Sequence, residues 1–251
     1  MQKHIFIRST KLALLLLKEQ FKEPTAILWT IISPSLLFYL INHANNPEKN
    51  PDFNYMEGSS WFYGYIAASV GLFGFALYIV GRRESGFIRS FIYTSTSKII
   101  FLAGQFLSYS VIAMIYCCTF YLLTKMFFGK LQASELFDIA VRFYACFLIF
   151  CTIGLILTLL PINFQNSSTI FSILLFTMIA LGVASSDTTP ENTFPLADQI
   201  NILNPLHLAN KIMRSGIEEN VETLVISMTT LTITLLLSMR HLRINPVWSR
   251  Y

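Results

Sequence analysis

A short stretch between two apolar runs holds the residues with the most scope for chemistry. It runs from Arg82 to Lys98 with the sequence RRESGFIRSFIYTSTSK. Its apolar side chains recur at positions i, i+1, i+4 and i+5, the spacing that gathers residues on one face of a helix. Burial of that face and pairing of the flanking charges are the chemistry by which such a helix binds another protein. The residues expected to make these contacts are Arg82, Arg83, Glu84, Gly86, Phe87, Ile88, Arg89, Phe91 and Ile92. An ordinary basic loop that only sets membrane topology is the competing interpretation.

Catalytic and metal-binding patterns are missing from the sequence. It contains no GxxxxGK[ST], HExxH or GxSxG pattern, so an ATP-binding P-loop and the corresponding hydrolase sites are not expected. All four histidines fall in flanks or loops, and the four cysteines fall in apolar runs, where thiols behave as small hydrophobes. We therefore expect a chain that is not an enzyme by itself and holds no metal and no cofactor.

Membrane helices must position the Arg82–Lys98 stretch. Of the 251 residues, 54% are hydrophobic and only 13% are charged, against roughly 25% charged in soluble domains. Five windows lack Asp, Glu, Lys and Arg: residues 24–47, 58–81, 99–124, 143–186 and 223–239. The window 143–186 is too long for one crossing and is broken by the turn signature PINFQNSS, so it holds two. The expected fold class is an all-α membrane protein, a single domain over 1–251, with spans at about 25–42, 59–81, 99–123, 139–160, 169–184 and 221–239.

Charge asymmetry orients these six spans. With the N-terminus inside, the cytoplasmic segments hold 12 of the 18 Lys and Arg residues. The positive-inside rule then places both termini and the Arg82–Lys98 stretch in the cytoplasm.

Two helices outside the spans are also predicted. Residues 3–23 form an amphipathic helix typical of the inner leaflet interface, although a simple basic flank to span 1 explains them equally well. Its expected apolar face comprises Phe6, Ala13, Leu14, Leu17 and Phe21. Between spans 5 and 6, Asn204 is a good N-cap, Pro205 a good first residue and Gly216 a good stop. We expect a short outer helix over 205–215, with Leu206, Ala209, Ile212 and Met213 on one apolar face.

Three features inside the spans carry further expectations. Pro34 predicts a kink in span 1. Gly64, Ala67, Ala68 and Gly71 form a stripe that lets another helix approach closely, and packing within the subunit is favoured over a dimer contact. Arg142, near the outer end of span 4, is expected to reach the outer headgroups.

Taken as a set, these features resemble the ABC-2 type permeases, the transmembrane subunits of type V ABC exporters. The resemblance covers the whole chain. It rests on the interfacial N-terminal helix, the six spans, the RRESG start of the stretch after span 2, and the outer helical segment that begins at Asn204-Pro205. In that family the loop after span 2 forms a coupling helix that fits a groove on the ATPase subunit. The resemblance carries this role to Glu84, Gly86, Phe87, Arg89, Phe91 and Ile92. Many members have a proline after this helix, where this chain has the sequence TSTS.

The resemblance also implies partners. It implies two copies of a separate ABC ATPase subunit, which hold the ATP and Mg, and a second permease copy or paralogue. It implies a multi-pass protein of the bacterial cell membrane in contact with membrane lipid. The basic residues form no patch typical of nucleic-acid binding, so no nucleic acid is expected.

The cargo is expected to be amphipathic or hydrophobic, because the spans are uncharged and rich in phenylalanine, with 22 in the chain. A toxin or antimicrobial peptide is favoured, and the chain is similar to staphylococcal permeases that export phenol-soluble modulins. The alternative is a non-transporting membrane scaffold or immunity protein that sequesters a peptide without ATP hydrolysis.

Overall fold

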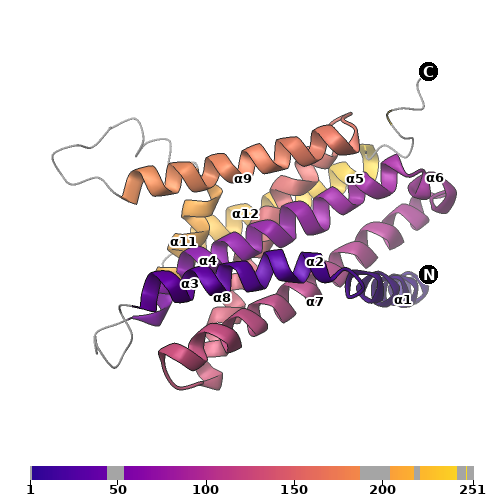
Figure 1. Cartoon of the computed structure of the whole chain (residues 1–251). Coiled ribbons are helices and arrows are strands. Elements are labelled where there is room, and N and C mark those ends of the chain that lie inside the picture. The colour runs from indigo at the N-terminus through magenta and orange to yellow at the C-terminus, as the bar shows by residue number, and fades with distance from the viewer. Residues whose placement is uncertain (1, 44–53, 187–203, 218–220, 242–246, 248–251) are drawn as a thin grey trace.

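The computed structural model describes residues 2–43, 54–186, 204–217, 221–241 and 247, and the regular structure of these residues is entirely helical (Figure 1). Four continuous helical segments are long and apolar enough to cross a membrane: Tyr55–Glu84, Thr96–Phe128, Ala133–Thr158 and Phe164–Val183. Two further apolar helices, Leu28–Asn42 and Met228–Leu237, are shorter. The all-helical, membrane-type architecture is therefore confirmed, and among the described residues four of the six expected spans coincide with segments that meet the length and hydropathy expected of a membrane crossing.

The described helices follow one another along the chain in this order. The first half comprises α1 (Gln2–Gln20), α2 (Pro24–Ile27), the π-helix η1 (Leu28–Ile32), α3 (Ser33–Asn42), α4 (Tyr55–Ser69), the π-helix η3 (Val70–Ala76), α5 (Leu77–Glu84) and α6 (Phe87–Phe91). The second half comprises α7 (Ser95–Phe128), α8 (Ala133–Thr158), α9 (Phe164–Ser186), α11 (Pro205–Ser215) and α12 (Val221–His241).

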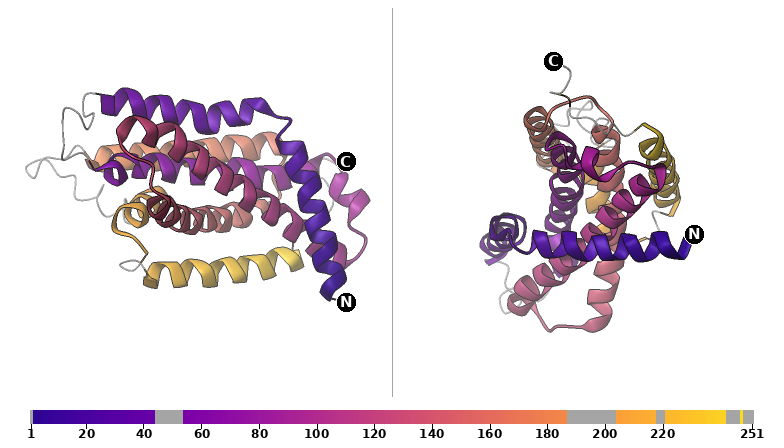
Figure 2. Two further views of the ribbon diagram at one scale, coloured as in Figure 1. Left: turned by 90° about the horizontal axis from the view of Figure 1, so that it is seen from below. Right: turned by 90° about the vertical axis from the view of Figure 1, so that its right-hand side faces the viewer.

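The long helices form a bundle with two distinct ends. At one end α1 lies across the bundle, at the same end as α6 (Figure 2). The connection between α7 and α8 and the short helix α11 lie toward the opposite end (Figure 1). The Arg82–Lys98 stretch and the predicted interfacial helix therefore share one end of the bundle, as expected for segments on the same side of a membrane.

Two helical segments contain π-helical turns that the sequence does not predict. η1 comes directly before Pro34, which occupies the first turn of α3. The irregularity near Pro34 is therefore a wider turn that absorbs the missing N–H donor, and the helix runs on from Pro24 to Asn42. η3 lies in the middle of the segment Tyr55–Glu84 and joins α4 to α5 without a break.

The small-residue stripe on the second segment packs within the subunit. Gly64 faces α11, where a Cβ atom would lie 3.3 Å from Leu206 Cδ1. Gly71 faces α8, where a Cβ atom would lie 2.7 Å from the Cβ atom of Phe150. The expectation that these residues serve internal packing is confirmed for both glycines.

The outer helix matches its expected bounds, because its signals are local. The Asn204 side chain accepts a hydrogen bond from the Leu206 amide at 3.0 Å, as an N-cap does. The four residues of its predicted apolar face are all buried, against α4, α8 and α9.

Arg142 does not follow its expected role. Its guanidinium donates to the carbonyl oxygens of Met213 at 3.0 Å and Arg214 at 3.3 Å, and it pairs with Asp138. The last carbonyls of a helix have no intrahelical donors and carry negative partial charge, so they attract a cation. The side chain that was expected at the lipid headgroups therefore caps α11.

The N-terminal helix α1 packs against α7, and several of its apolar side chains remain exposed. Ala13 and Leu16 are buried, and Leu12 of α1 packs close to Gly104 of α7. Phe6 and Leu14 of the predicted apolar face stay exposed, as does Phe21 just beyond the helix. These residues offer the apolar surface that an interfacial helix presents to lipid.

Candidate functional site

The predicted docking stretch is divided among three helices. Arg82, Arg83 and Glu84 belong to the last turn of α5, so they extend the second membrane-type segment. Gly86 turns the chain with a φ of 77° and begins α6, which is only five residues long. Thr94 then caps α7, its hydroxyl accepting from the Ser97 amide at 3.2 Å. The helix expected across the stretch is therefore confined to Phe87–Phe91.

The apolar residues of α6 face two ways. Ile88 is 0% exposed and Ile92, just beyond the helix, is 5% exposed, so both anchor the segment to the core of the bundle. Phe87 and Phe91 are only half-buried, and their rings stack with centroids 5.8 Å apart. Arg89 is exposed beside them. The predicted four-residue face is thus split into two internal anchors and an aromatic pair at the surface.

Arg82 lies on the side of α5 that faces α1. Its guanidinium contacts the Glu19 carboxylate and the Tyr78 hydroxyl, and Tyr78 donates to Glu19 at 2.7 Å. It also lies over the Phe87 ring, 5.0 Å from the centroid. Arg82 therefore joins the end of α1 to the first residue of α6.

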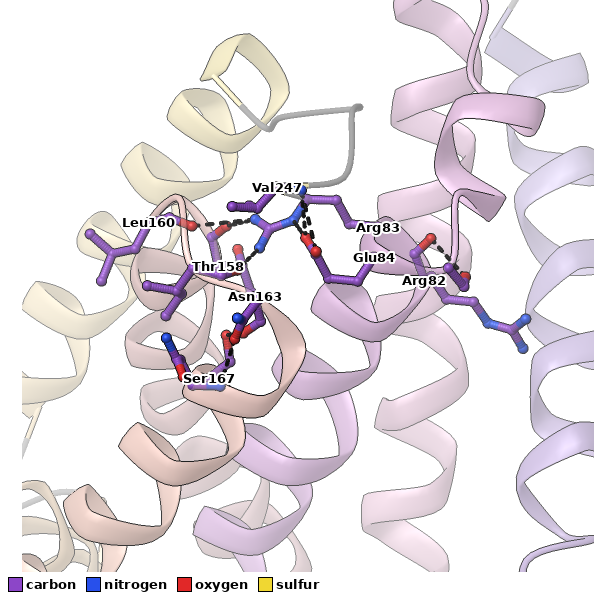
Figure 3. A network of polar contacts seen from close by, with 11 residues as sticks. Arg82, Arg83, Glu84, Thr158, Leu160, Asn163, Ser167 and Val247 are labelled. Atoms are coloured by element: carbon purple, nitrogen blue, oxygen red, sulfur yellow. Dashed lines mark hydrogen bonds and ion pairs between the residues drawn. The ribbon is translucent and has the colours of Figure 1, made fainter. Parts of the chain in front are cut away.

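Arg83 points to the other side of α5, into the connection between α8 and α9 (Figure 3). It donates to the carbonyl oxygens of Thr158 at 3.0 Å and Leu160 at 3.3 Å, and to that of Ile162. The side chain is 1% exposed. Because all of its contacts are internal, it is not available as a surface charge for a partner, and its place among the docking residues needs correction.

Glu84 completes this polar cluster. Its carboxylate pairs with Arg83 Nε at 3.0 Å and accepts from the backbone amide of Val247 at 3.2 Å (Figure 3). A buried guanidinium needs a counter-charge close by, and Glu84 supplies it. This residue too has a structural role that the sequence pattern does not reveal.

A cavity of about 920 Å³ opens beside this end of the bundle. Its walls come from the α1–η1 region, the α4–α5 segment, α7 and α9, and most of them are apolar or aromatic. Glu19 and Arg82 lie in the wall, together with side chains such as Trp29, Tyr109 and Phe176. Its lining is therefore mixed, with the Glu19–Arg82 ion pair beside apolar and aromatic side chains.

The chemistry of this region is binding and positioning. Among the described residues, no group of three His, Cys, Asp or Glu side chains could hold a metal ion. Arg82, Arg83 and Glu84 contact other segments of the chain, and the surface of α6 presents two aromatic rings and the exposed guanidinium of Arg89. Such a surface can bury against a groove of another protein.

The chain is similar to a known protein over almost its whole length. The chain is 31% identical to Protein McbE of Escherichia coli over 244 residues, which cover 95% of this chain and 98% of the relative. No family model matches the chain, and no solved structure matches it.

Proposed function

This chain belongs to the same family as Protein McbE of Escherichia coli, and from that premise we propose that it is the transmembrane subunit of an ATP-driven ABC exporter of the ABC-2 type. In this proposal the continuous helical segment from Pro24 to Asn42 and helix α12 (Val221–His241) cross the bacterial cell membrane together with the four long segments. Both termini and α6 then face the cytoplasm, in agreement with the distribution of Lys and Arg.

The observation that carries the proposal is the form of α6. It is a short helix held at one end of the bundle by two buried isoleucines, with the Phe87–Phe91 pair half-buried at its surface. Both rings pack in part against the core, and the area that they leave exposed is apolar surface of the kind that marks protein interaction sites. A soluble ATPase subunit that covered them would bury apolar area and could pair an acidic group with Arg89.

The other subunits of the proposed exporter are inferred from the absence of an ATP-binding motif in this sequence. The chain has no P-loop, so ATP and Mg are held by the ATPase, of which two copies are required. A second copy of this chain or a paralogue completes the path for the cargo. Closure of the ATPase pair would move α6 and, with it, the helices that α6 joins.

The proposed cargo is an amphipathic or hydrophobic peptide of the toxin or antimicrobial class. The 920 Å³ cavity supports this choice, because aromatic and aliphatic walls meet a Glu19–Arg82 pair at one end. An amphipathic helix could lay its apolar face along such walls and direct a polar group to that pair.

The experiment replaces Phe87 and Phe91 together by aspartate and measures the ATPase that co-purifies with the tagged chain. The loss of two aromatic contacts costs about 2 kcal/mol or more, which corresponds to an affinity lower by about 30-fold. The matched control is Phe137→Asp, which places the same change on a 72% exposed phenylalanine of α8 at the opposite end of the bundle. Unchanged co-purification in the double variant would contradict docking through α6.

The alternative function, a scaffold or immunity protein that sequesters a peptide, draws on the same cavity. It needs no ATPase and no movement of α6. Peptide protection that persists in the Phe87→Asp, Phe91→Asp variant, and in cells whose partner ATPase is inactive, would favour the alternative. Loss of function in both conditions would favour the exporter.

A further inference from the structure

The connection between α8 and α9 is held by a residue from another helix. The connection's own hydrogen bonds are short-range ones, such as that from the Ile162 amide to the Leu160 carbonyl at 2.9 Å, and none of its side chains is charged. The carbonyl groups of Thr158, Leu160 and Ile162 also accept from Arg83, which comes from a distant part of the chain. Without Arg83, the last residue of α8 and two residues of the connection would lose this donor.

Arginine is the side chain that can make this set of contacts. Its guanidinium presents five N–H donors in a rigid fork, and it stays charged. Three backbone carbonyls and the Glu84 carboxylate use that fork from two sides. These hydrogen bonds are directional, so they fix the orientation of the α8–α9 connection relative to α5 as well as its distance from α5.

The same arginine lies at the base of α6. Only Ser85 and Gly86 separate α5 from α6, and Ile88 and Ile92 fix α6 to the core. Gly81, one turn before Ser85, packs against Phe164 at the start of α9. A displacement of α6 therefore reaches the end of α5 directly, at the point where α5 meets the α8–α9 connection.

We propose that Arg83 is a positioning residue that carries movement of α6 into the α8–α9 connection. The inference rests on the proposed function, because a docked ATPase must supply the movement. With Arg83 in place, the end of α5 and the connection move as one body, and α8 and α9 follow. Without it, α5 and α6 move while the connection stays behind. Arg82 makes the corresponding link to α1 through Glu19.

The test measures hydrogen exchange in the complex of the tagged chain with its co-purified ATPase, before and after addition of ATP with vanadate. The wild type should show a nucleotide-induced difference in peptides covering both 86–98 and 156–167. Arg83→Ala should keep the difference over 86–98 and reduce that over 156–167 by about fivefold or more, the lower range of coupling between sites. Arg83→Lys keeps the buried charge and loses the fork, so it should show a reduction even if the alanine variant does not assemble.

The matched control is Arg142→Ala. Arg142 also donates to two carbonyls at a helix end, but this helix is α11, which lies toward the opposite end of the bundle (Figure 1). It should leave both nucleotide-induced differences intact, although it disturbs a similar set of hydrogen bonds. A structural role without transmission would change the baseline exchange over 156–167 and leave the nucleotide-induced difference unchanged, and that result would overturn the inference.

The other outcomes of this experiment distinguish failure of the inference from failure of the proposed function. A bound ATPase with unchanged differences in both Arg83 variants overturns the inference and leaves the proposed function standing. A wild-type chain that binds no ATPase overturns the proposed function and the inference with it. Equal loss in the Arg83 and Arg142 variants indicates general loosening and also overturns the inference.

Discussion

Gly71 of η3 and Phe150 of α8 are in direct contact, since a Cβ atom on the glycine would lie 2.7 Å from the Cβ atom of the phenylalanine. The backbone of α8 lies almost as close, with the Cys151 amide nitrogen at 3.2 Å from the same point. A side chain can relieve a close contact by changing its rotamer, whereas the backbone of a helix can do so only if the helix moves. The packing of the second membrane-type segment against α8 therefore depends on the absence of a side chain at position 71.

Gly71→Ala should destabilise the protein by about 1–3 kcal/mol, the usual cost of overpacking a core. Gly64→Ala is the matched control, because its new Cβ atom would meet the flexible end of Leu206 at 3.3 Å. Thermal unfolding in detergent, followed by size-exclusion chromatography after heating, compares the two variants. Equal stability of both would show that α8 shifts freely.

Gly86→Ala should weaken the turn into α6 by about 1–2 kcal/mol, since the residue has a φ of 77° and a side chain with Cβ resists that conformation. No atom lies within 4 Å of the new Cβ position, so the cost is conformational and not steric. Gly86→Asn should be milder, because asparagine tolerates the left-handed region. Faster hydrogen exchange over 87–92 in the alanine variant than in the asparagine variant would support this account, and the reverse order would contradict it.

Arg142→Ala should release the end of α11 at a cost of about 1–3 kcal/mol, because two carbonyls lose their donor. Arg214→Ala removes only an exposed pair with Glu57, worth at most about 1 kcal/mol. Limited proteolysis near residues 213–217 and the apparent melting temperature distinguish the two. A larger effect at Arg214 would exclude Arg142 as the cap of this helix.

Local signals in the sequence were sufficient for several helices. α11 has its N-cap, its first-turn proline and its terminal glycine within a dozen residues, and its apolar spacing falls on the buried face. The long apolar runs likewise predicted the membrane-type helices. Their ends were less well predicted, because helices such as α7 continue beyond the apolar window into polar residues.

Contacts between distant segments could not be read from the sequence. The partners of Arg83 are backbone carbonyls, which have no residue identity, on a connection 75 to 79 residues further along the chain. The carbonyls that Arg142 caps are equally remote. In α6, helical spacing predicted one apolar face, but a five-residue helix at the end of a bundle has a core on one side and open surface on the other.

The π-helix η3 affects the orientation of the α5 side chains around the helix axis. An α-helix turns by about 100° per residue, and a π-helical turn spans one residue more than an α-helical one, so the π-helical conformation of Val70–Ala76 affects which way each side chain of α5 faces. A deletion inside η3 could be absorbed, because a π-helical turn that loses its extra residue becomes an α-helical turn. Deleting one residue early in α5 instead, with η3 and the end of α5 held in place, would bring Arg83 to the position of Arg82 and Glu84 to that of Arg83. A carboxylate would then stand against the carbonyls of the α8–α9 connection. A change in chain length within the membrane-type segment would thus reverse the electrostatics at its end without altering any charged residue.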